Sequence, residues 1–184
     1  MITQFKLFEK IYTNDDLFAS IILGRLADIK EYLTNGGDIN IIFNSNENML
    51  SVAARNGYTY IVKYLIKEGI DLDWVDYLNR SVLILLCSTH LNSKSEELVK
   101  ILIDAGADLN IKDKKNQTAL YYAAQNNEMD LVRLLIDTEW SIVSNLNKTF
   151  YDVLYKTNQN YIRKTFPEKY NEYMKKIKTK EFNL

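Results

Sequence analysis

The sequence predicts an all-α repeat protein, a solenoid of stacked helix-turn-helix units joined by β-hairpin-like loops. One phrase recurs along the chain: an apolar run, then Gly, a small residue, Asp, an aliphatic residue and Asn or Asp. Its glycine is Gly36, Gly69 and Gly106, and Glu139 takes that place in a degenerate fourth copy, so the intervals are 33, 37 and 33 residues. A period near 33 residues is typical of a stacked solenoid, because one unit cannot bury its own apolar face.

A second phrase lies between the copies and predicts the first helix of each unit. Residues 118–124 read Thr-Ala-Leu-Tyr-Tyr-Ala-Ala, and residues 48–54 and 81–87 occupy the same slots. The small Ala pairs allow the two helices of a unit to approach closely. Downstream, aliphatic residues at spacings of one, three and four predict an amphipathic second helix, which a glycine with positive φ then ends.

The spacing divides the chain into seven consecutive segments. We expect an N-terminal cap helix over residues 1–12, repeat 1 over 13–40, repeat 2 over 41–73, repeat 3 over 74–110, repeat 4 over 111–143, a degenerate repeat 5 over 144–166, and a C-terminal capping helix and tail over 167–184.

The first repeat follows a short apolar segment. Residues 1–12 place Ile2, Phe5 and Phe8 on one helical face, which predicts a cap helix or an extension of the first repeat. We expect the two helices of repeat 1 over residues 15–22 and 25–35, with Gly24 at the turn between them.

Repeat 3 contains four extra residues. The gap from Cys87 to Leu98 is 11 residues, whereas the matching gap from Ala54 to Ile61 is 7. The surplus lies in the polar residues 88–97, which indicates an enlarged loop between the paired helices, with Ser95 as the expected N-cap of the second. A tolerated surface insertion and a partner contact are both compatible with this loop.

The C-terminal segment carries the only proline. Pro167 is well placed as the first residue of a helix, and Phe166, Tyr170, Met174 and Ile177 follow one another at helical spacing. A final repeat has no neighbour to cover it, so this helix is expected to cap the stack. The alternative is an amphipathic helix on a membrane surface.

These phrases together resemble the ankyrin repeat, over roughly residues 15–166. The resemblance implies a scaffold that binds another protein on its concave face, formed by the hairpin tips and the exposed side of the first helices. The sequence departs from the family pattern in every copy. Asp16, Met49, Val82, Ala119 and Phe150 replace the family's proline, and Phe18, Ser51, Ile84, Tyr121 and Asp152 replace its histidine. Lower local stability than in consensus-like repeats is therefore expected.

Composition excludes several classes. No stretch approaches the roughly 18 apolar residues of a membrane helix, and the N-terminus lacks a secretory core. A single cysteine, Cys87, allows no internal disulfide and predicts a reducing, cytoplasmic location, or the host cytoplasm for a delivered effector. Residues 1–144 carry a net charge of −6 and residues 145–184 carry +5, which indicates a solvated basic cap or contact with an acidic partner. Nucleic acid is not expected as a partner.

The sequence contains no pattern that predicts catalysis, a cofactor or a metal. His90 is the single histidine, and Cys87 fills a buried alanine slot. Asp71, Asp73 and Asp76 lack the Gly and the closing Glu of a calcium loop. The chain is therefore expected not to be an enzyme.

The expected partner-binding residues lie on the hairpin tips. Aromatic residues beside an arginine make good interface anchors, although Phe43 and Trp74 are also compatible with packing between hairpins. Three lysines form an adjacent rim that is either solvated or steers an acidic partner. The candidates are Phe43, Trp74, Tyr77, Leu78, Arg80, Lys112, Lys114, Lys115 and Gln117.

The function that follows is a non-enzymatic protein-protein interaction module, monomeric by itself and without membrane insertion. The alternative is an inhibitor, immunity protein or secreted pathogen effector that blocks a specific target enzyme. The Asn-, Ile-, Lys- and Tyr-rich composition, which is typical of an AT-rich genome, motivates this alternative.

Overall fold

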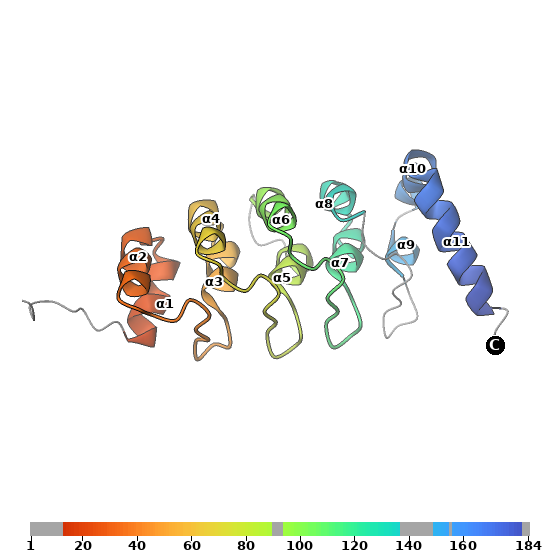
Figure 1. The fold of residues 1–184 in the computed structure, drawn as a ribbon. Coiled ribbons are helices and arrows are strands. Elements are labelled where there is room, and N and C mark those ends of the chain that lie inside the picture. Colours follow the sequence, from red (N-terminus) through yellow and green to blue (C-terminus); the bar gives the residue numbers. More distant parts are fainter. Residues whose placement is uncertain (1–12, 90–93, 137–148, 155, 182–184) are drawn as a thin grey trace, which may run out of the picture.

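The computed structural model forms an elongated stack of helix pairs, from α1 at the left to α11 at the right of Figure 1. It describes residues 13–89, 94–136, 149–154 and 156–181. The predicted cap helix over residues 1–12, the loop residue His90 and the junction of repeats 4 and 5 lie outside these residues. The fold is all-α, as predicted, and its described part contains two isolated β-bridges, Ile42 with Asn48 and Val75 with Ser81.

The described helices alternate between the first and second member of each pair. They are α1 (Asn14–Ile22), α2 (Leu26–Thr34), α3 (Met49–Arg55), α4 (Thr59–Lys67), α5 (Val82–Ser88), α6 (Ser95–Asp104), α7 (Ala119–Gln125), α8 (Met129–Leu134), α9 (Phe150–Val153), α10 (Lys156–Thr165) and α11 (Pro167–Glu181).

A polar N-cap residue starts each first helix. The side chains of Thr13, Asn48, Ser81 and Thr118 each accept a hydrogen bond from the backbone N–H three residues later. Such a cap stabilises a helix by about 1 kcal/mol. Because first helices such as α3 and α5 have only seven residues, these caps help to set where the helices begin.

Glycines in the left-handed region end the second helices. Gly36, Gly69 and Gly106 have φ values of 84°, 87° and 90°, a conformation that costs glycine little. The predicted cap of α6 was wrong by one residue: Lys94 is the N-cap, and Ser95 is the first residue of the helix. Polar residues before a helix often leave its start ambiguous within a residue or two.

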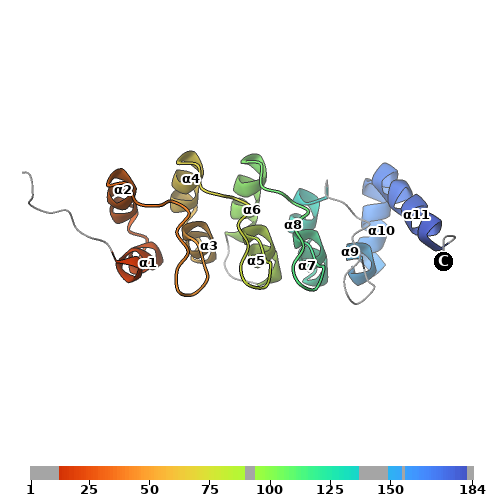
Figure 2. The ribbon, with the colours of Figure 1, turned by 60° about the horizontal axis from the view of Figure 1, so that its bottom comes forward.

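The core runs the length of the stack. The first helices pack in series, α1 on α3, α3 on α5, α5 on α7 and α7 on α9, while α1, α3, α5 and α7 also pack on their own second helices. Figure 2 shows the resulting two rows of helices. Ile61 and Leu65 of α4 are fully buried, as are Ala53 and Ala123 of the Ala pairs. The small residues therefore lie where close approach of the helices requires them.

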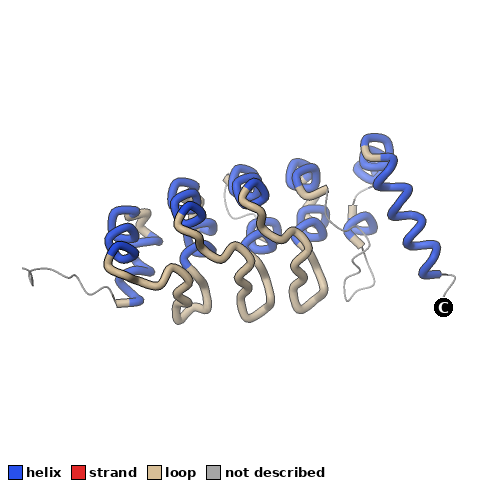
Figure 3. The backbone as a smooth tube through the Cα atoms, viewed as in Figure 1, coloured by secondary structure: helices blue, strands red, loops and turns tan. Residues whose placement is uncertain are grey.

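The loops that connect one repeat to the next extend to the same side of the stack. Figure 3 shows these connections projecting together beyond the first helices. Each hairpin tip that the structure describes contains an asparagine in the left-handed region: Asn46, Asn79 and Asn116, with φ values of 53°, 61° and 58°. Asparagine tolerates this conformation better than most residues, so the tips share one backbone shape.

The C-terminal helix α11 packs against the last described helices. It begins at Pro167, as predicted, and contacts α10. Tyr173 is 5% exposed, and its hydroxyl lies 2.8 Å from the Thr149 hydroxyl. Tyr151 stacks near Tyr170 and Tyr173, with centroid distances of 5.5 and 5.6 Å. The side chain of Ile177 is outside the described set. None of the helices within the described residues is long and apolar enough to cross a membrane.

Candidate partner-binding surface

The tips of the second, third and fourth hairpins are residues 42–47, 75–80 and 112–117. The tip of the third hairpin is held in shape by Asp76. Its Oδ1 accepts hydrogen bonds from the backbone N–H of Leu78 (2.9 Å) and of Arg80 (2.8 Å). Its Oδ2 accepts from Nε of Arg80 (2.8 Å), and Nη2 of Arg80 lies 2.6 Å away. The Asp76 side chain is only 5% exposed. A nearly buried carboxylate with this many donors fixes the backbone of the tip and the direction of the Arg80 side chain.

Asp113 does the same in the fourth hairpin. Its Oδ1 accepts from the backbone N–H of Lys115 and of Gln117, both at 2.8 Å, and its Oδ2 accepts from the Tyr122 hydroxyl at 2.7 Å. Burial raises the pKa of Tyr122, and the hydrogen bond to Asp113 raises it further. The Tyr122 hydroxyl therefore remains a donor well above neutral pH.

The third and fourth hairpins are joined directly. The backbone N–H of Lys114 donates to the carbonyl of Leu78 at 3.0 Å, and the side-chain amide of Asn79 donates to the carbonyl of Lys112. These bonds connect repeats at their tips, where first helices do not reach. The two tips therefore form one continuous surface.

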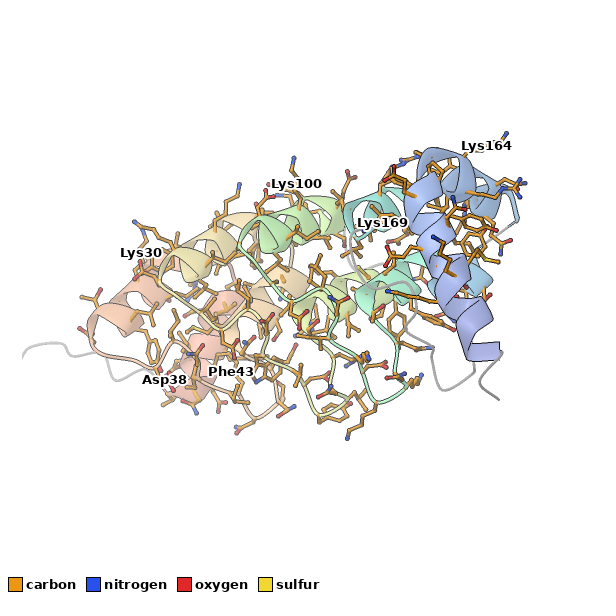
Figure 4. All side chains as sticks on the ribbon, turned by 45° about the vertical axis from the view of Figure 1, so that its right-hand side comes forward. Lys30, Asp38, Phe43, Lys100, Lys164 and Lys169 are labelled. Atoms are coloured by element: carbon orange, nitrogen blue, oxygen red, sulfur yellow. The ribbon has the colours of Figure 1, made fainter. Side chains whose placement is uncertain are left out.

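The second hairpin differs because Phe43 occupies the slot of Asp76 and Asp113. Phe43 is 4% exposed, and its ring lies 5.1 Å from that of Phe18 at an interplanar angle of 64°. In place of the carboxylate, an edge-to-face aromatic pair anchors this tip on α1. The sequence left Phe43 either at the partner surface or packed between hairpins; its ring is buried against Phe18. Figure 4 places it on the hairpin side, away from Lys30 and Lys100 of the second helices.

The remaining candidates differ in how far their side chains are exposed to solvent. Tyr77 is 63% exposed, whereas Trp74, Leu78 and Arg80 are half-buried. Lys112, Lys114 and Lys115 are all exposed on the fourth hairpin. Gln117, the last of the expected partner-binding residues, is 4% exposed, and its backbone N–H donates to Asp113.

A pocket of about 320 Å³ lies between the second and third hairpins. Leu85 of α5 and Thr89, which follows that helix, contribute to its lining together with the two hairpins. Three of the predicted residues, Trp74, Tyr77 and Arg80, line it. Ligand sites usually enclose about 300–1,000 Å³, so this pocket is at the small end of that range.

Sequence reasoning missed the second ion pair of the pocket. Arg55, at the end of α3, places Nε 3.0 Å from Oε1 of Glu47, and its Nη2 donates to Oε2 at 3.1 Å. Both residues stand in slots that the resemblance assigns to the concave side. Their pairing was not predictable because α3 lies between them in the sequence and the meeting of their side chains depends on how that helix packs, while their charges alone are typical of any solvated surface.

Cys87 and the acidic side chains show no arrangement for chemistry in the part of the chain that the structure describes. Cys87 is fully buried, and this burial raises the pKa of its thiol, so the thiolate needed for a nucleophile is disfavoured. Among the described residues, no three His, Cys, Asp or Glu side chains are grouped to hold a metal ion.

Comparison with protein families gives one match. The model of the family described as "Ankyrin repeats (3 copies)" matches residues 17–113 and 86–160, which together cover well over half of the chain. The repeated phrases and the stacked helix pairs described above are the features that this family shares.

Individual relatives are similar over parts of the chain. An ankyrin repeat protein of fowlpox virus (strain NVSL) is 34% identical over 107 residues, 54% of this chain and 25% of the relative. Another from the same virus is 29% identical over 89 residues, 48% of this chain and 26% of the relative. An L-asparaginase of Dirofilaria immitis is 26% identical over 145 residues, 63% of this chain and 25% of the relative.

The chain thus spans about a quarter of the length of these relatives. The partial, 26% identical alignment with L-asparaginase gives no ground for transferring an activity. The family match, the helix pairs and the shared hairpin geometry agree with one another. The chain belongs to the ankyrin repeat family, whose repeats generally act as protein-protein interaction modules and are generally non-enzymatic.

Proposed function

We propose that this chain is a non-enzymatic module that holds a partner protein on its concave side, across the tips of the second to fourth hairpins. The observation that carries this proposal is the exposure of Tyr77, an aromatic side chain that is 63% exposed at the rim of a pocket. Beside it lie the half-buried Trp74 and Leu78. Aromatic residues at such positions are typical interface hot spots.

The rigidity of the tip supports the same proposal. The bonds to Asp76 fix the hairpin before a partner arrives, and the bond from Lys114 to Leu78 fixes its neighbour. A surface that is already ordered loses less conformational entropy on binding. Three adjacent tips with their first helices have about the extent that a standard interface requires, roughly 800 Å² per partner.

The test is site-specific photocrosslinking in extracts of the native source. A photoreactive amino acid replaces Tyr77 in one variant and Leu23 in a control variant. Leu23 is also apolar and exposed (58%), but it lies at the turn between α1 and α2. We expect a discrete crosslinked protein from position 77 alone, and its yield should fall when unmodified wild-type chain is added in excess.

A second measurement excludes adventitious capture. The crosslinked protein should co-purify with the wild-type chain and should be lost with the double variant Tyr77→Ala, Leu78→Ala, whose circular dichroism should match that of the wild type. The proposal fails if the partner binds the folded double variant undiminished, or if it crosslinks from position 23 instead of position 77.

A further inference from the structure

The pocket between the second and third hairpins is lined by two arginines and two carboxylates, and each carboxylate is already paired with one of the arginines. Asp76 accepts from two backbone N–H groups and from the Arg80 guanidinium. Both oxygens of Glu47 meet the Arg55 guanidinium. A cationic side chain entering this pocket would find each carboxylate compensated by an arginine, so the pocket does not favour a cation.

The arginine side of the pocket retains donors. A guanidinium has five N–H donors, and Asp76 engages the Nε and Nη2 groups of Arg80. The Arg80 side chain is 27% exposed, so its outer edge reaches solvent at the pocket lining. That edge offers N–H groups to an incoming oxygen, and a carboxylate matches the fork of a guanidinium and forms strong, charge-assisted hydrogen bonds with it.

The apolar part of the lining fits one side chain of a partner. Trp74, Tyr77 and Leu85 all line the pocket, and its volume is about 320 Å³. This volume is close to the lower limit of about 300 Å³ for ligand sites. A pocket of this size holds an anchoring side chain and excludes a large cofactor or a folded element.

Positive charge continues from the pocket onto the fourth hairpin. Lys112, Lys114 and Lys115 are exposed there, while the acid of the same hairpin, Asp113, is 8% exposed and accepts three hydrogen bonds within its own repeat. The fourth tip is held beside the third by the bond from Lys114 to Leu78. An occupant that extends from the pocket toward the C-terminal repeats therefore meets basic side chains.

From these observations we infer that the site takes an extended, acidic peptide segment of the partner, with one apolar side chain anchored in the pocket and carboxylates lying over the lysines of the fourth hairpin. This inference rests on the proposed function and specifies its partner. Packed helices are about 8–10 Å apart, so the fourth tip lies about one and a half spacings, roughly 12–15 Å, from a pocket between the second and third tips. An extended chain advances about 3.3 Å per residue and covers this distance in about four residues.

The experiment is selection of a displayed random twelve-residue peptide library on the full-length chain. Selected peptides are then measured by fluorescence in the variant Trp140→Phe, in which Trp74 is the single tryptophan. We expect selected peptides to carry an apolar residue and at least two carboxylates about four residues from it, and to change the emission of Trp74.

Two matched triple variants distinguish the charge of the fourth hairpin from the net charge of the chain. The first variant replaces the lysines of the fourth hairpin: Lys112→Gln, Lys114→Gln, Lys115→Gln. Its affinity for the selected peptides should fall by about tenfold at low salt and by less at high salt. Lys67→Gln, Lys100→Gln, Lys164→Gln removes the same charge from exposed positions of α4, α6 and α10 and should leave their affinity unchanged.

The inference is overturned if the selected peptides are neutral or basic, if the two triple variants behave alike, or if the library yields no peptide that alters Trp74 emission. The proposed function still holds after any of those results if a partner protein binds the wild-type chain and loses affinity for the Tyr77→Ala, Leu78→Ala variant. A partner protein that binds this variant undiminished contradicts the proposed function itself, so the two failures are distinguishable.

Discussion

At the scale of single residues, one hairpin slot shows how a substitution changes what a loop can do. Asp76 and Asp113 fix their tips through backbone donors, whereas Phe43 fixes its tip through Phe18 of the preceding first helix. The carboxylate leaves neighbouring side chains such as Tyr77 directed outward. The phenylalanine instead buries its own ring. The residues that the second tip contributes to the pocket are polar.

Leu65→Ala tests the assignment of buried residues. Leu65 of α4 is fully buried, and a large-to-small change there should lower the free energy of unfolding by about 2–5 kcal/mol, because it adds a cavity to the lost transfer energy. Lys67→Ala, two residues along the same helix and exposed, should change it by less than about 0.5 kcal/mol. Urea denaturation followed by circular dichroism measures both; equal midpoints for the two variants would contradict the burial of Leu65.

Tyr122 makes stability depend on alkaline pH. Its pKa is raised above the ordinary 10.0 in the folded chain, so the unfolded chain loses this proton at lower pH than the folded chain does. Stability from this group is therefore complete below about pH 10 and declines as pH rises further. Tyr122→Phe should show a shallower loss of stability between pH 10 and 11 than the wild type, measured by denaturation at each pH. Identical slopes would contradict a raised pKa of Tyr122 in the folded chain.

At the scale of elements, the sequence predicts the helices and turns that recur in every repeat, but it does not fix the elements that lie outside the regular spacing. The helix pairs and the terminal glycines follow from slots that recur at a fixed spacing, and Pro167 was correctly placed by its missing N–H. The predicted N-cap of α6 was wrong by one residue, because the insertion before this helix breaks the fixed spacing from which the other repeats are aligned.

The candidate site was predictable only in part. Trp74, Tyr77 and Arg80 line one pocket, as their proximity in sequence allows. The burial of Phe43 and Gln117 depends on contacts with other elements, and an aromatic or amide side chain in a loop carries no local signal of which way it faces. The pairing of Arg55 with Glu47 was hidden for the same reason.

The C-terminal helix α11 offers a prediction at this scale. Deleting residues 167–184 removes Tyr173 and its contact with Thr149, and it should expose Leu154 and Ile162, which are now 4% and 0% exposed. Uncovered apolar surface at the end of a solenoid promotes association. We expect a lower melting temperature and aggregation detected by light scattering; a monomeric truncated chain with an unchanged melt would show that the segment is a tail.

At the scale of the whole molecule, the chain combines a continuous core with a polarised surface. Residues 1–144 carry −6 and residues 145–184 carry +5, while the fourth tip adds a local cluster of lysines near the pocket. Charges at a rim act mainly on the rate of encounter, whereas desolvated aromatic anchors act mainly on dissociation. The two kinds of residue should therefore separate in kinetics.

The affinity of the purified partner for the double variant Tyr77→Ala, Leu78→Ala tests the central claim most directly. Surface plasmon resonance should show binding weakened by about 2–4 kcal/mol, roughly 30- to 1,000-fold, through faster dissociation. Leu23→Ala should bind like the wild type. Unchanged affinity of the folded double variant would contradict the claim that the hairpin tips hold the partner.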